Sequence, residues 1–151
     1  MAVEARYAHT NIIAKDWRKL AAFYADIFGC APVLPERDLK GKLIDDLTGM
    51  EDAHICGIHL RLPGLGDSGP TLEIFEFNEE QERPPTAINR QGLAHLAFEV
   101  SDVEAAMAAV LEAGGGKIGQ LVTGEIPKAG RITLVYLTDP EGNIIELQKW
   151  G

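Results

Sequence analysis

Hydrophobic residues recur with helical spacing in the first part of the chain. Leu20, Phe23, Tyr24 and Ile27 follow the i, i+3, i+4, i+7 spacing of a helix that buries one face. This stripe predicts an amphipathic helix from about Asp16 to Phe28, and the glycine that follows is expected to end it.

A second helix is predicted about ninety residues further on. The stretch Ser101–Glu104 has the serine and glutamate of a capping box, which marks a helix start. The run of glycines at 114–116 is expected to stop this helix. Its predicted apolar face consists of Val103, Met107, Val110 and Leu111.

The remaining apolar runs are short and predict strands. Each helix is preceded by one short strand. Four later strands are predicted at Ile55–Leu62, Thr71–Phe77, Ile132–Leu137 and Asn143–Lys149. Further strands are expected near Ala31–Leu34 and near Lys117–Val122, and KLIDDLTG reads as a short helix.

These elements repeat along the chain. Residues 8–30 align with residues 94–116 at a constant offset of 86, so that His9 matches His95 and Asp16 matches Asp102. We therefore expect one α+β domain, residues 1–151, built from two strand–helix–strand–strand–strand modules. The modules span about 5–78 and 93–151, joined by a polar, proline-containing linker at 79–92.

Composition and charge exclude several classes of partner. The formal net charge is −9 and no cluster of Lys or Arg stands out, so neither nucleic acid nor an anionic membrane is an expected partner. No apolar run approaches the roughly 20 residues that span a bilayer. MAVEARYAHT lacks a signal-peptide core, so we expect a cytoplasmic protein. Cys30 and Cys56 are expected to be separate thiols.

The candidate chemistry follows the repeat. His9 and His95 each lie in the first strand of a module, while Glu73 and Glu146 each lie inside the last strand. An unpaired carboxylate in a buried strand is costly, so each glutamate should face water, a cation or a metal. Two imidazoles and two carboxylates suit a divalent ion such as Zn, Ni, Co, Mn or Fe.

Each of these residues also has an ordinary structural interpretation, as a hydrogen-bonded histidine or a glutamate on a solvated strand face. The matched positions in both modules favour the metal site. His54 and His59 have no counterpart in the second module and are weaker ligand candidates. Glu76 lies on the opposite strand face from Glu73 and is expected to face solvent.

Four stretches give the chain a family resemblance: AHTNIIAKDWRKLAAFYADIFG, TLEIFEF, GLAHLAFEVSDVEAAM and YLTDPEGNIIEL. The chain resembles the vicinal oxygen chelate superfamily, which includes glyoxalase I, bleomycin resistance proteins and extradiol dioxygenases. The resemblance implies paired βαβββ modules that form a cupped, barrel-like mixed sheet, and a homodimer. It places the family's four metal ligands at His9, Glu73, His95 and Glu146, contributed by one chain or by two.

The resemblance implies a metal-dependent enzyme that removes a proton next to a carbonyl, with the metal stabilising the enolate or enediolate. The His/Glu/His/Glu order is similar to bacterial glyoxalase I, a lactoylglutathione lyase, whereas GLAHLAFEVSDVEAAM is closer to methylmalonyl-CoA epimerase, an isomerase. Glu73 or Glu146 would move the proton. Two alternatives stay open: a small-molecule binding module of the bleomycin resistance type, and an iron-dependent dioxygenase.

Further residues are candidates for contacts with a small-molecule substrate. Asn11 and Glu99 share strand parity with His9 and His95, and Glu99 could also move the proton. Arg61, Lys128 and Arg131 could bind an anionic group, although each such residue is more often simply surface charge. The glycine-containing stretches 35–50 and 119–130 are candidate lids over the site.

Overall fold

The structure, a computed structural model, describes residues 1–151. The chain divides into two compact units, Met1–Glu82 and Arg83–Gly151. None of the helices combines the length and the apolar character that crossing a bilayer requires.

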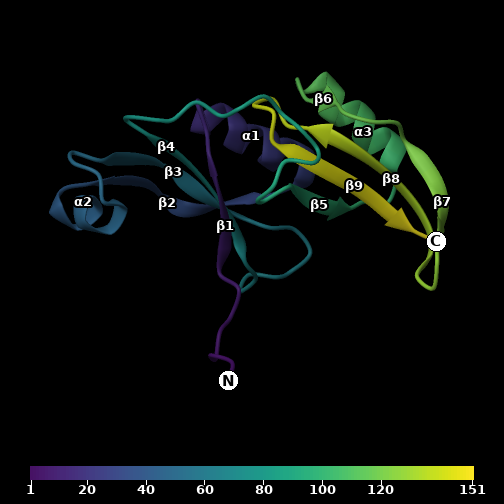
Figure 1. Cartoon of the computed structure of the whole chain (residues 1–151), viewed down its shortest axis with the longest axis horizontal. Coiled ribbons are helices and arrows are strands. Elements are labelled where there is room, and N and C mark those ends of the chain that lie inside the picture. Colours follow the sequence, from purple (N-terminus) through teal and green to yellow (C-terminus); the bar gives the residue numbers. More distant parts are fainter. The chain divides into compact units, whose positions relative to one another are not determined.

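The first unit is one four-stranded mixed sheet with two helices (Figure 1). The sheet order is β1-β4-β3-β2; β1 runs parallel to β4, and the other pairs are antiparallel. The elements in chain order are β1 His9–Ile13, α1 Trp17–Phe28, β2 Ala31–Lys40, α2 Lys42–Thr48, β3 His54–Arg61 and β4 Thr71–Phe77.

Helix α1 covers one face of this sheet. Leu20 and Tyr24 are fully buried, as are Leu60 of β3 and the alternate residues Leu72 and Ile74 of β4. The Asp16 carboxylate accepts a hydrogen bond from the Lys19 backbone N–H and so begins the helix. Because α1 covers the even-numbered face of β3 and β4, their odd-numbered residues point to the other face.

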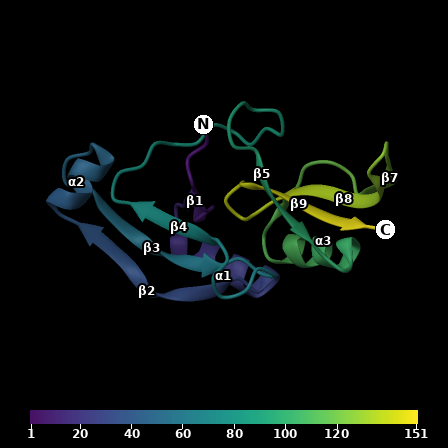
Figure 2. The same cartoon turned by 90° about the horizontal axis from the view of Figure 1, so that it is seen from below.

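The predicted short helix is present as α2. It packs Ile44 onto Ala53 and Ile55, so a small second core lies at one end of the sheet. Figure 2 shows α2 beyond the ends of β2 and β3. The stretch 35–50, predicted as a lid, is therefore mostly β2 and α2 rather than an irregular loop.

The second unit repeats the first with one change. Its elements are β5 His95–Glu99, α3 Val103–Glu112, β6 Gly116–Lys117, β7 Val122–Ile126, β8 Gly130–Thr138 and β9 Ile144–Trp150. The sheet order is β5-β9-β8-β6, with β7 also paired to β8, and β5 runs parallel to β9. Strands β6 and β7 together take the place of β2, whose pairing with β3 is itself interrupted between Val33 and Arg37.

Helix α3 begins one residue later than predicted. Asp102, not Ser101, is the N-cap, and its carboxylate accepts a hydrogen bond from the Ala105 N–H. Aspartate accepts at a cap as well as serine, and the repeat supports this register because Asp16 caps α1. Val103 and Val110 are buried as predicted, whereas Leu111 remains 38% exposed.

The turn before β9 is organised by a buried carboxylate. Asp139 is 1% exposed and accepts hydrogen bonds from the backbone N–H groups of Glu141 and Asn143 and from the Asn143 side-chain amide. Three donors satisfy the charge that burial would otherwise penalise. The turn thereby fixes where β9, and Glu146 within it, begins.

The predicted α+β fold of two βαβββ modules with mixed sheets is confirmed, and neither sheet closes into a barrel. Several strand boundaries were wrong: β2 extends to Lys40, and the strand predicted at Lys117–Val122 is split into β6 and β7. The second predicted lid, 119–130, contains β7 and its turn into β8. Cys30 and Cys56 are free thiols, as expected.

Candidate metal centre

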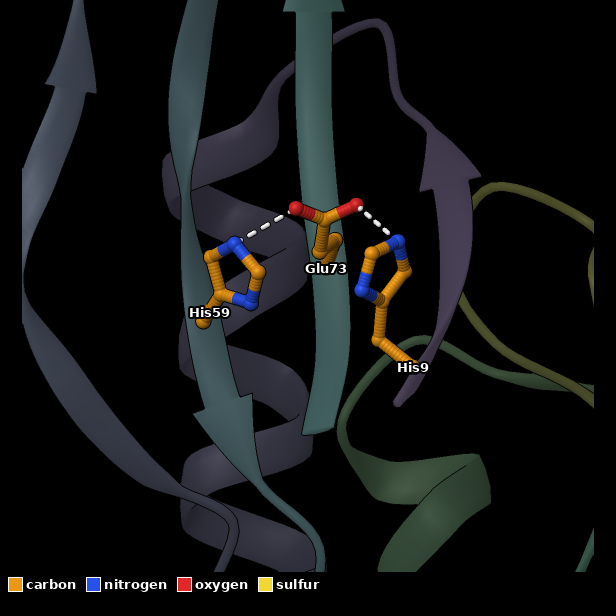
Figure 3. A group of neighbouring side chains, drawn as sticks. All are labelled: His9, His59 and Glu73. Atoms are coloured by element: carbon orange, nitrogen blue, oxygen red, sulfur yellow. Dashed lines mark ion pairs between the residues drawn. The ribbon is translucent and has the colours of Figure 1, made fainter. Parts of the chain in front are cut away.

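The first unit brings three chemically active side chains together on the sheet face opposite α1. His9 comes from β1, Glu73 from β4 and His59 from β3. Strand pairing places Asn11 and His59 directly across from Glu73, on its two neighbouring strands. Figure 3 shows the three side chains on the near side of the strands, with the helix behind them.

Glu73 is the centre of this group. Its Oε1 lies 2.9 Å from His9 Nε2 and accepts a hydrogen bond from Asn11 Nδ2 at 3.3 Å, while Oε2 lies 2.5 Å from His59 Nε2. Glu73 is only 8% exposed. The two imidazoles cover the carboxylate, so a residue placed inside a strand is buried without being unpaired.

His59 belongs to the group although the sequence favoured only His9 and Glu73 in this module. Its Nδ1 lies 2.9 Å from the Thr71 hydroxyl, which fixes the direction of the ring. Burial lowers the pKa of His59, and the charge of Glu73 opposes this effect. The neutral imidazole is the form that coordinates a metal.

A signal for His59 was present in the sequence. Strands β3 and β4 form a hairpin in which Arg61 pairs with Thr71. Two residues further from the connecting loop on each strand, His59 pairs with Glu73. The alignment of the two modules matches equivalent positions of the repeat but says nothing about which residues pair across neighbouring strands. It therefore did not identify His59 as a partner of Glu73.

The second unit has a related arrangement. His95 Nε2 of β5 lies 3.9 Å from Glu146 Oε2 of β9, and the two side chains are 28% and 14% exposed. Tyr136 of β8 pairs with Glu146 as His59 pairs with Glu73, and its ring lies 5.1 Å from the His95 ring. His59 therefore does have a positional counterpart, but it is a tyrosine.

The first-unit group has the composition of a metal site. One ring nitrogen of His9, one of His59 and one oxygen of Glu73 all lie within 4.8 Å of one another. Two imidazoles and a carboxylate are a donor set that zinc, manganese and iron accept, so these residues fit a divalent ion. The hydrogen bond between His59 Nδ1 and the Thr71 hydroxyl is the type of outer contact that orients a metal-binding histidine.

The other predicted contact residues are distributed unevenly. Asn11 donates a hydrogen bond to Glu73. Arg61 lies on the same sheet face as His59, but its guanidinium donates a hydrogen bond to the Gly69 carbonyl at 2.6 Å. Glu99 is exposed at the end of β5. Lys128 lies in the exposed turn between β7 and β8. Arg131, at the start of β8 and away from Tyr136, is 3.7 Å from Glu125.

Glu76 does not simply face solvent as predicted. It lies on the α1 face of β4, and its Oε2 accepts a hydrogen bond from the Trp17 N–H, the first of α1. A free N–H at a helix start attracts a carboxylate, which explains a partly buried glutamate at this position.

Solved structures that resemble this chain share its fold. A glyoxalase family protein from Bacillus cereus has a TM-score of 0.84 at 17% identity, with 99% of this chain and 96% of that chain covered. A glyoxalase/bleomycin resistance protein/dioxygenase domain from Frankia has a TM-score of 0.59 at 17% identity, covering 100% of both chains. The fosfomycin resistance protein FosX from Listeria monocytogenes, complexed with Mn(II) and sulfate, has a TM-score of 0.53 at 14% identity, covering 99% and 95%.

A comparison with curated protein sequences gave no significant match. The sequence profile of the Glyoxalase/Bleomycin resistance protein/Dioxygenase superfamily, in contrast, matches residues 6–147, which is nearly the whole chain. That span contains both histidine–glutamate pairs and both βαβββ modules. The chain belongs to the glyoxalase/bleomycin resistance protein/dioxygenase superfamily.

Proposed function

We propose that the protein is a metal-dependent enzyme of the glyoxalase I or epimerase type, which removes a proton from a carbon next to a carbonyl. The proposed ligands are His9, Glu73, His95 and Glu146, from one chain or from two. One observation carries the proposal: Glu73 is 8% exposed, and each of its oxygens lies within 3 Å of an imidazole nitrogen.

The surroundings of Glu73 support a ligand role for it. Asn11 and His9 contact Oε1 and His59 contacts Oε2, so the carboxylate is held in one orientation before any ion arrives. When bound, a divalent ion would polarise a substrate carbonyl and make the neighbouring C–H more acidic. His59 would keep the second oxygen of Glu73 directed, because Thr71 fixes its ring.

Of the two glutamates, Glu146 is the better candidate for moving the proton. Glu73 is held by three side chains, whereas the ion pair of Glu146 with His95 is longer, at 3.9 Å. A carboxylate that transfers a proton must reach the carbon and return, so a loosely held group suits the task. Its 14% exposure limits competing bulk water.

The test is proton exchange at carbon. Protein reconstituted separately with Zn, Ni, Co, Mn and Fe is incubated in deuterated water with the methylglyoxal–glutathione adduct or with methylmalonyl-CoA, and exchange is followed by NMR. Metal-dependent exchange that Glu146→Gln reduces by about 10²-fold or more supports the proposal. If no metal gives proton exchange with either substrate, the result counts against a substrate of the glyoxalase I or epimerase type.

The control for Glu73 is on the same strand. Glu73→Gln should lose Mn²⁺ binding and activity together, whereas Glu76→Gln changes a residue of β4 on the α1 face and should keep both. Equal effects of both variants would mean that the loss reflects general damage to β4.

A second candidate function is iron-dependent ring cleavage. His9, His59 and Glu73 are two histidines and one carboxylate, the donor set of non-haem iron oxygenases. In this case Fe(II) protein should consume oxygen with a catechol, and His59→Ala should abolish consumption while Glu146→Gln should not. Protein that retains no metal would instead support a small-molecule binding module.

We also propose a homodimer in the cytoplasm. The family resemblance supports the dimer, since paired modules in this superfamily come from one chain or two. Sedimentation equilibrium should give twice the 16.4 kDa mass of the chain. A monomer that still binds metal would place all of the ligands in one chain.

A further inference from the structure

A second cluster of ligand-type side chains lies on the first unit, away from the Glu73 group. Asp38 of β2 pairs directly across from Cys56 of β3, and His54 precedes Cys56 by two residues on the same strand. Strand alternation puts His54 and Cys56 on one face of β3 and His59 on the other. The two clusters therefore lie on opposite faces of the sheet.

Three different donor atoms meet at one point of this cluster. His54 Nε2 lies 2.5 Å from Asp38 Oδ1 and 3.5 Å from Cys56 Sγ, and all three atoms lie within 4.8 Å of one another. Tetrahedral bonds of about 2.3 Å to sulfur and about 2.0 Å to nitrogen separate those two ligands by roughly 3.5 Å. The sulfur–nitrogen distance thus already matches a zinc site.

A cysteine–histidine–aspartate catalytic triad does not explain the same contacts. A triad uses both ring nitrogens, one facing the nucleophile and one facing the carboxylate. Here Nε2 alone faces both Cys56 and Asp38.

The charged groups around Cys56 are mixed and partly paired with one another. Asp38 and Glu76 are its acidic neighbours, and Arg18 and Lys40 are its basic ones. The Arg18 guanidinium, however, is already bound through both terminal nitrogens to Glu36, at 2.9 Å each. Asp38 and His54 have side chains 70% and 38% exposed, so an ion can enter from solvent.

We propose that Asp38, His54 and Cys56 form a second, independent metal site for a thiophilic divalent ion such as Zn²⁺ or Co²⁺. A thiolate and a carboxylate supply two negative charges, and the imidazole supplies a neutral donor. The ion would replace the proton between His54 and Asp38, move Asp38 slightly outward, and join β2 to β3. The site does not depend on the proposed enzymatic function.

Cobalt binding tests the site. Full-length Glu73→Gln protein, stripped of metal and kept reduced, is titrated with Co²⁺, because a cobalt–thiolate bond gives charge-transfer absorption in the near ultraviolet. We expect this band at one Co²⁺ per chain. It should be lost in Glu73→Gln/Cys56→Ser and kept in Glu73→Gln/Cys30→Ala, since Cys30 is the 1% exposed cysteine elsewhere in the unit.

A second measurement covers the case in which a cysteine variant does not fold. In the wild-type protein, saturating Zn²⁺ should slow alkylation of Cys56, measured by mass spectrometry, and His54→Ala should remove this protection. Three results would each overturn the proposal. The Glu73→Gln protein gives no charge-transfer band, the band persists in Glu73→Gln/Cys56→Ser, or Zn²⁺ does not change the rate of Cys56 alkylation.

Discussion

At the scale of single residues, the chemistry depends on how Glu73 is held. The sequence predicted that a carboxylate inside a strand needs a partner, and that His9 lies near it. It did not predict His59 or Thr71, because these partners come from hairpin register, and register follows from strand lengths that the sequence sets only approximately. Asn11 was found from parity alone.

The role of His59 gives the first prediction. His59→Ala leaves one oxygen of Glu73 undirected, so Mn²⁺ affinity should fall by about 10- to 100-fold, the usual effect of losing an orienting partner. Isothermal titration measures this, with Glu76→Gln as the control. An unchanged affinity would mean that His9 and Asn11 alone orient the carboxylate.

Cys30 gives a prediction about pH. Burial raises the pKa of the Cys30 thiol from 9.0 to about 11. Between these values the unfolded chain releases the thiol proton and the folded chain retains it, so the free energy of unfolding should fall as pH rises from 9 towards 11. Urea unfolding across this range should show a smaller decline for Cys30→Ala; equal declines would contradict the assignment.

At the scale of secondary structure, the apolar spacing and the repeat predicted most elements. Strand β4 has the predicted boundaries, and the α1 stripe is buried at Leu20, Phe23 and Tyr24. The predicted strand boundaries were wrong where pairing with a neighbouring strand determines the length of a strand. Strand β2 continues past an irregularity in its pairing, and two strands, β6 and β7, occur where one was predicted. Such interruptions follow from the partner strand and leave little trace in local sequence.

The turn at Asp139 gives a prediction at this scale. Asp139→Ala removes the acceptor of three hydrogen bonds at a buried site, so we expect a loss of about 2 kcal/mol in the free energy of unfolding. Urea denaturation measures this. Glu125→Ala, at an exposed position of β7, should change stability by less than about 0.5 kcal/mol. A similar loss in both variants would show that the Asp139 turn contributes nothing special.

At the scale of the whole molecule, one offset of 86 residues relates the first strands, the helix caps and the histidines of the two modules. The glutamates, Glu73 and Glu146, keep matching places in the last strands although the segments between histidine and glutamate differ in length. The modules have nevertheless diverged at the position across from the glutamate, where one has His59 and the other Tyr136. The repeat therefore predicts the positions of the groups but not their full composition. Glu73 accordingly has two imidazole contacts and Glu146 has one longer contact, so Glu146 is the proposed ligand to which we assign proton transfer.

The most direct test of the account is manganese binding by four proteins: the wild type, Glu73→Gln, Glu146→Gln and Glu76→Gln. Mn²⁺ prefers oxygen and nitrogen ligands, so the Cys56 site should contribute little. We predict one tightly bound Mn²⁺ per chain in the wild type and in Glu76→Gln, and strongly weakened binding in Glu73→Gln and Glu146→Gln. Undiminished binding in Glu73→Gln would contradict the central claim, and undiminished binding in Glu146→Gln alone would confine the ligands to the first unit.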